Sequence, residues 1–203
     1  MRRDASALRS AGLQACQISA TACLLLTLGP FFGAERADRG DTAVQARGSA
    51  EAQRSFRRGL TALERAERLG GAMGPYALQA AIAACHARAA TAAETDWPRI
   101  VALYDAVAQL APSPVVELNR AVAVGMAFGP AAGLDLVDGL VREPALEAYH
   151  LLPAVRGDLL RKLGRYVEAR AEFERAASLT ENVVERKLLQ RRAAECGAEE
   201  MAG

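Results

Sequence analysis

The 203-residue sequence predicts an all-α fold made of antiparallel helix hairpins. Three observations lead to this prediction. Apolar side chains recur at helical spacing from about residue 52 onward, and no segment of useful length alternates with the period of two that is typical of a strand. Gly–Pro and Ser–Pro pairs separate these helical segments at short intervals. Aromatic residues make up only 5% of the chain, and small side chains favour close contact between helices over a sheet sandwich.

The first predicted helices have recognisable start and stop signals. One helix covers roughly residues 52–69 and ends at Gly70–Gly71. Pro75 lies in the first turn of the next helix, where a proline is tolerated because its missing N–H has no partner there. Asp96 is the expected N-cap of a third helix, which contains Pro98 in its first turn.

The later helices are delimited in the same way. Ser113–Pro114 is expected to cap and start a helix, and Gly129–Pro130 ends that helix and starts another. After Glu143–Pro144 the sequence predicts two helices joined by the turn "LGRY" at 163–166. Asn182, with Glu185 three residues later, predicts a capping box at the start of the last helix.

The stretch "YHLLPAVRGDLLRKLGRYVEARAEFERAASLTEN" at 149–182 predicts a specific kind of hairpin. Gly157, Ala169, Phe173 and Ala176 are separated by 12, 4 and 3 residues, the offsets of the small, small, large and small positions of a tetratricopeptide (TPR) repeat. Gly157 and Ala169 would let the two helices of the hairpin approach closely, and Phe173 would fill the space beside the neighbouring hairpin. The prediction is therefore a TPR-like array, an α-solenoid; an unrelated helical bundle is the alternative.

Two weaker copies of this pattern are expected upstream: Ile100, Tyr104 and Val107, and then Ala132, Leu136 and Gly139. Tyr104 precedes Leu136 by 32 residues and Leu136 precedes Phe173 by 37, which brackets the 34-residue TPR period. An array of this kind leaves a concave face for a partner.

The amino-terminal 50 residues do not share this pattern. They begin with two arginines and contain the short apolar run "ACLLLTLGPFFGA", an arrangement that resembles a weak secretion signal but is too short to span a membrane. We expect residues 1–50 to be a poorly ordered leader, residues 51–197 to be the helical domain, and residues 198–203 to be a tail. A cleaved signal segment and a wrongly assigned start codon are the alternatives for the leader.

Composition and motifs argue against several classes of function. Lys+Arg is 25 and Asp+Glu is 24, so no global field attracts nucleic acid or an anionic membrane. The sequence contains no phosphate-binding glycine loop, no zinc-protease motif and no nucleophile elbow. The four cysteines lack C-x-x-C and zinc-finger spacing, which favours a reducing cytoplasm. We expect no enzymatic activity, no cofactor and no metal.

Polar residues within otherwise apolar helices are the candidate partner-binding residues. Gln79 lies in "YALQAAIAAC", and Asn119 and Arg120 lie in "VVELNRAVAV". Both segments are first helices of predicted pairs, and first helices line the concave face of a TPR array. The alternative is that these side chains make buried hydrogen bonds between adjacent hairpins.

Three long strings carry a resemblance to a known family: "GPYALQAAIAACHARAATAAETDWPRIVALYDAV", "PSPVVELNRAVAVGMAFGPAAGLDLVD" and "YHLLPAVRGDLLRKLGRYVEARAEFERAASLTENVVERKLL". They resemble the carboxy-terminal TPR-like extension of one group of bacterial extracytoplasmic-function (ECF) sigma factors of RNA polymerase. The resemblance covers roughly residues 52–196 and implies protein–protein contact that modulates transcription initiation, with sigma regions or RNA polymerase as the partner.

The regions with which such sigma factors bind polymerase and promoter DNA have no counterpart in the sequence. The resemblance therefore implies a truncated or split sigma factor, or a stand-alone partner, that does not bind nucleic acid directly. An exported stand-alone TPR adaptor is the alternative if residues 1–34 are a secretion signal.

Overall fold

The computed structural model describes residues 61, 74–89 and 92–202. Every regular element in these residues is helical: seven α-helices and two short 3₁₀ helices occur, and no strand is present in the described part of the chain. The predicted all-α class is confirmed. The expected leader at residues 1–50 and nearly all of the expected helix at 52–69 lie outside the described residues.

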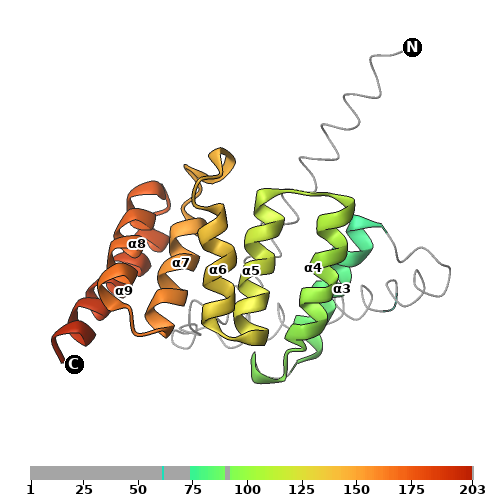
Figure 1. The fold of residues 1–203 in the computed structure, drawn as a ribbon, viewed down its shortest axis with the longest axis horizontal. Helices are drawn as coiled ribbons and strands as arrows, with labels where there is room; N and C mark the ends of the chain where they lie inside the picture. The colour runs from blue at the N-terminus through green and yellow to red at the C-terminus, as the bar shows by residue number, and fades with distance from the viewer. Residues whose placement is uncertain (1–60, 62–73, 90–91, 203) are drawn as a thin grey trace, which may run out of the picture. The chain divides into compact units, whose positions relative to one another are not determined.

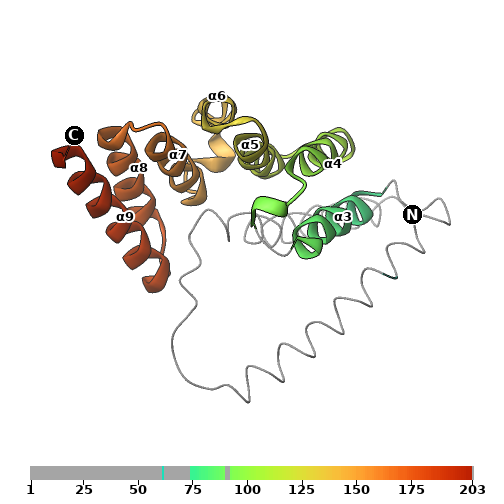
Figure 2. The same cartoon turned by 90° about the horizontal axis from the view of Figure 1, so that it is seen from below.

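The chain divides into two compact units, Met1–Ala111 and Pro112–Gly203. The described part of the first unit contains α3 (Pro75–Arg88), η1 (Ala92–Glu94) and α4 (Trp97–Leu110). The second unit contains α5 (Pro114–Phe128), α6 (Pro130–Leu140), η2 (Pro144–Leu146), α7 (Leu151–Lys162), α8 (Tyr166–Leu179) and α9 (Val183–Ala202). Within the second unit, each helix from α5 to α9 packs against the next in chain order (Figures 1 and 2).

In the first unit, α3 packs against α4. The expected cap of α4 is present, because the Asp96 carboxylate accepts a hydrogen bond from the backbone N–H of Arg99 at 3.1 Å. The Trp97 ring is buried and meets the His86 ring edge-on, with 5.2 Å between ring centroids. Ile82 and Tyr104 are also buried. This ring contact at the start of α4 therefore joins it to the end of α3.

The α5–α6 hairpin depends on two glycines that face each other. A Cβ atom added to Gly133 would lie 2.8 Å from the Cα of Gly125 and 3.0 Å from the carbonyl oxygen of Ala121. The turn between the helices is made by Gly129, whose φ of +102° is readily adopted only by glycine. Ser113 occupies the N-cap position of α5, but its side chain makes no capping hydrogen bond, contrary to expectation.

The register predicted for α6 is one residue out. Its buried residues are Gly133, Leu134 and Val137, whereas Leu136 is only half-buried and Gly139 is exposed. The turn determines which residues of α6 face α5, because the helix starts at Pro130 and this start places Gly133 against α5. Ala121, Gly133 and Val137 then have the same 12- and 4-residue offsets as Gly157, Ala169 and Phe173.

The α7–α8 hairpin confirms the close approach predicted from the sequence. A Cβ atom added to Gly157 would lie 3.0 Å from Cε1 of Phe173 and 3.2 Å from the carbonyl oxygen of Ala169. Ala169, Phe173 and Ala176 are completely buried. Gly164 adopts the expected left-handed conformation, with a φ of +74°, in the turn between the two helices.

The start of α9 confirms half of the predicted capping box. The Asn182 side-chain oxygen accepts hydrogen bonds from the backbone N–H groups of Val184 and Glu185, at 2.9 and 3.4 Å. The reciprocal contact is replaced, because the Thr180 hydroxyl donates to the Glu185 carboxylate and accepts from the Asn182 N–H. α9 continues to Ala202, so residues 198–202, expected as a tail, are helical.

Candidate functional site

The three predicted partner-binding residues differ in their access to solvent. Gln79, on α3, is 5% exposed, and Asn119, on α5, is completely buried. Arg120 follows on α5 with 28% of its side chain exposed, and its Nη1 lies 3.4 Å from Oε2 of Glu117. Arg120 is thus the member of the set that a docking partner reaches without a rearrangement.

The three positions are divided between the two compact units. Gln79 belongs to the first compact unit, while Asn119 and Arg120 belong to the second. Burial of Gln79 and Asn119 favours the alternative that they make internal polar contacts. Both residues have an interaction partner. The assignment to a partner-binding face stays a prediction, and it rests on Arg120.

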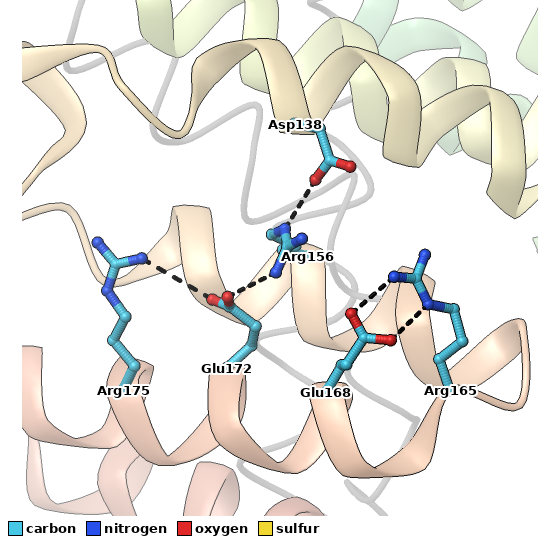
Figure 3. Close-up of polar contacts among 6 residues, drawn as sticks. All are labelled: Asp138, Arg156, Arg165, Glu168, Glu172 and Arg175. Carbon is cyan, nitrogen blue, oxygen red and sulfur yellow. Dashed lines mark hydrogen bonds and ion pairs between the residues drawn. The ribbon is translucent and has the colours of Figure 1, made fainter.

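A charged network that the sequence did not reveal joins α6, α7 and α8 (Figure 3). Arg156, on α7, donates from Nε to Asp138 on α6 at 2.8 Å and from Nη1 to Glu172 on α8 at 2.6 Å. Arg175 approaches the other oxygen of Glu172 at 4.0 Å. We call Asp138, Arg156, Glu172 and Arg175 the Arg156 network. Its charges alternate in sign and sum to zero, so it offers no excess positive charge for phosphate groups.

Burial and hydrogen bonding act in opposite directions on Arg156. Burial lowers the pKa of its guanidinium, but the hydrogen bonds from Arg156 to Asp138 and Glu172 outweigh this and leave the pKa raised. The cation is therefore fixed between two carboxylates. Its partners lie 18 residues before it and 16 residues after it, and separations of that size carry no local helix signal.

The neighbouring pair Arg165–Glu168 is local and exposed. Both guanidinium nitrogens that donate, Nε and Nη2, reach the carboxylate, at 2.7 and 2.6 Å (Figure 3). Hydrogen bonding from Arg165 lowers the pKa of Glu168. The two side chains are about half exposed, so this contact contributes little to stability.

A second charged cluster joins α7 and α9 around a buried carboxylate. The Asp158 side chain is 2% exposed, and its Oδ1 accepts a hydrogen bond from Nη1 of Arg192 on α9 at 3.1 Å. Lys162 and Arg161 also approach the carboxylate, at 2.9 and 3.6 Å. We call Asp158, Arg161, Lys162 and Arg192 the Asp158 cluster. Burial lowers the pKa of Arg192, and the charge of Asp158 opposes that shift.

Two cysteines and two histidines lie among the residues that the structure describes. Cys85 and Cys196 are buried free thiols whose pKa values are raised mainly by burial, and the thiolate is the reactive form. Burial lowers the pKa of His86, which favours the neutral imidazole. His150 lies 3.2 Å from the Glu185 carboxylate, which also accepts a hydrogen bond from Thr180. Over the described residues, no group of three or more His, Cys, Asp or Glu side chains could hold a metal ion.

An open depression of about 390 Å³ lies on α8 and α9, lined by Glu174, Ala177, Ser178, Arg186 and Gln190. Three of its four polar side chains have internal partners: Arg186 donates to the Thr180 carbonyl at 2.7 Å, and the Ser178 hydroxyl donates to the Arg175 carbonyl at 2.7 Å. Glu174 accepts a hydrogen bond from Arg170 at 2.9 Å. The depression therefore lacks convergent groups that would orient a small ligand.

Of the helices that the structure describes, none combines the length and apolar character needed to cross a bilayer.

Comparison with known proteins gives one informative match. No family model matches the sequence, and no solved structure matches it. An uncharacterized protein of Rhizobium meliloti (strain 1021), R00370, is 51% identical over 112 residues. These residues are 55% of this chain but only 26% of the relative. The chain thus spans about a quarter of the length of this relative.

Proposed function

We propose that the described helices form a TPR-like array of antiparallel hairpins. The observation that carries this is the repeated contact geometry of two hairpins. In α5–α6, Ala121 and Gly133 meet, and in α7–α8, Gly157 and Ala169 meet; in both pairs the second residue follows the first by 12 positions. A large buried side chain, Val137 or Phe173, then follows four residues later. The 36 residues between the two sets are close to the 34-residue TPR period.

The array acts as a protein-binding region related to the carboxy-terminal extension of an ECF sigma factor. The long strings that resemble that extension support this role. The match to a stretch of a much longer bacterial protein supports it further, since a regulatory extension occurs as part of a larger chain. The expected partner is RNA polymerase or the sigma regions, and the expected compartment is the cytoplasm.

The array is not an enzyme and does not bind promoter DNA. Burial raises the pKa values of Cys85 and Cys196, which disfavours the reactive thiolate, and the charged networks pair cations with carboxylates. Arg120, on the first helix of the α5–α6 hairpin, is the proposed contact residue of the partner-binding face.

Binding of the purified chain to purified core polymerase, and separately to a purified ECF sigma factor that lacks an extension, tests this function. We expect one of the two to bind, and Arg120→Ala to weaken that binding. Arg191→Ala is the matched control, because Arg191 is also a partly exposed helix arginine with a carboxylate partner, Glu195 at 3.5 Å. Absence of binding to both proteins contradicts the proposed function. If the two variants weaken binding equally, the assignment of Arg120 to the binding face is contradicted, but the proposed function is not.

A further inference from the structure

The last helix buries few apolar side chains for its length. α9 has 20 residues, yet its buried side chains over 183–201 are Leu189, Arg192, Ala193 and Cys196. Val183 and Val184, in its first turn, are 58% and 76% exposed. Because hydrophobic stabilisation scales with the apolar area removed from water, the docking of α9 gains little from large side chains.

By contrast, α5 shows what a helix of the core buries. In 15 residues it buries Val116, Leu118, Val122 and Val124, together with two alanines. The difference marks α9 as the helix of the second unit with the weakest apolar anchorage for its length. Elements with few buried apolar contacts open at lower free energy than the core around them.

A charged side chain occupies the centre of the α9 interface. The Arg192 guanidinium lies over the Phe173 ring on α8, with its central carbon 5.9 Å from the ring centroid, and it reaches Asp158 on α7. A second polar contact between α7 and α9 lies near their amino termini, where His150 precedes α7 and meets Glu185. Docking of α9 therefore combines extensive packing against α8 with polar contacts to α7 and to His150 just before it.

The Asp158 cluster contains one carboxylate and three cations, and the cations are not equivalent. Arg161 and Lys162 lie on the same helix as Asp158, and each is about one third exposed. When α9 leaves, Asp158 keeps these two partners, and Arg192 is hydrated by water. When Asp158 loses its charge, Arg192 is left buried beside two like charges, which is strongly unfavourable.

We propose that α9 is a conformational latch. It undocks and docks as one helix while α5–α8 stay folded, and the charge of Asp158 keeps it docked. Undocking uncovers the Phe173 ring beneath Arg192. The latch is independent of the partner proposed above, because it rests only on contacts within the second compact unit.

Hydrogen exchange of the full chain, read by mass spectrometry at peptide resolution, tests the latch. In the wild type, amides of α9 should exchange faster than those of α5–α7. Asp158→Asn should raise exchange within residues 183–202 by on the order of 100-fold while α5–α7 change little. Arg192→Met should have a smaller effect, because Met covers Phe173 and Asp158 keeps Lys162 and Arg161.

The double variant Asp158→Asn/Arg192→Met should recover most of the α9 protection that Asp158→Asn loses, because it removes the buried cation. Arg191→Met, which alters an exposed neighbour, is the matched control and should exchange like the wild type. Equal protection of α9 and α5–α7 in the wild type overturns the latch, and this result does not depend on any variant folding. The latch is also overturned if α9 is no better protected from exchange in the double variant than in Asp158→Asn.

Discussion

Gly133 and Gly139 occupy the same helix but have opposite surroundings. A Cβ atom at Gly133 would meet the backbone of Gly125 at 2.8 Å, whereas nothing lies within 4 Å of one at Gly139. Backbone atoms cannot yield as a flexible side chain can, so Gly133→Ala should lower the free energy of unfolding by about 1–3 kcal/mol. Gly139→Ala should be neutral or raise it by about 0.4–1 kcal/mol, because alanine restricts the unfolded chain. Chemical denaturation of both variants measures the difference, and equal stabilities would contradict the corrected register of α6.

Ala169 makes the corresponding contact in the next hairpin. It is completely buried opposite Gly157, and the Phe173 ring lies beside them. Ala169→Leu should therefore overpack the contact and lower the free energy of unfolding by about 1–3 kcal/mol. Ala171 is exposed on the same helix, and Ala171→Leu is the control. A denaturation midpoint unchanged by Ala169→Leu would show that the α7–α8 contact is misassigned.

At the scale of elements, the Arg156 network links α6 to the α7–α8 hairpin. Arg156 and Glu172 are 20% and 15% exposed, so their ion pair is less screened by solvent than a surface pair. Arg156→Met should lower the free energy of unfolding by about 1–2 kcal/mol, since it leaves Glu172 partly buried with a more distant cation. Arg165→Met breaks an exposed pair and should cause no measurable change. If urea denaturation showed equal losses for both variants, the network would not join the helices as described.

Sequence patterns located most of the helix boundaries because the signals were local. Helices start or end at the positions predicted from four local signals: Asp96, Pro75, Gly129–Pro130 and Gly164. The 12-residue spacing of Gly157 and Ala169 also predicted their contact correctly. The register of α6 was wrong by one residue because Ala132 and Leu136 satisfy the small–large pattern as well as Gly133 and Val137 do. Only the contact with Gly125 distinguishes them.

The charged clusters could not be predicted from the sequence. Asp158 and Arg192 are 34 residues apart and meet only because α7 and α9 both pack against α8. Asp138, Arg156 and Glu172 likewise come from three different helices. Gln79 and Asn119, polar residues in apolar helices, are buried, and their assignment to a binding face stays a prediction. The sequence could not distinguish a buried polar contact from a residue of a binding face, because both place a polar group among apolar neighbours.

For the molecule as a whole, removing residues 1–50 tests whether they contribute to the stability of the helical domain. A chain that begins at Glu51 should keep its helical content per residue and a Tm within a few degrees of the full chain, because we expect residues 1–50 to lie outside the helical core. Circular dichroism during thermal unfolding measures both quantities. A Tm lower by more than about 8 °C would place part of the leader in the core, since roughly 1 kcal/mol shifts Tm by only a few degrees in a chain of this size.

The proposed function is that this chain regulates transcription through protein contact and does not select promoters itself. In vitro transcription from an ECF-type promoter with purified core polymerase tests it most directly, in two arms. With the chain alone, we predict no promoter-specific transcript, because promoter binding relies on clustered Lys and Arg that neutralise phosphates, and the chain has a formal net charge of only +1. With the chain added to core polymerase and a separate sigma factor that lacks the extension, we predict a changed yield of specific transcript. Specific transcripts from the chain and core polymerase alone, or an unchanged yield in the second arm, would contradict the account.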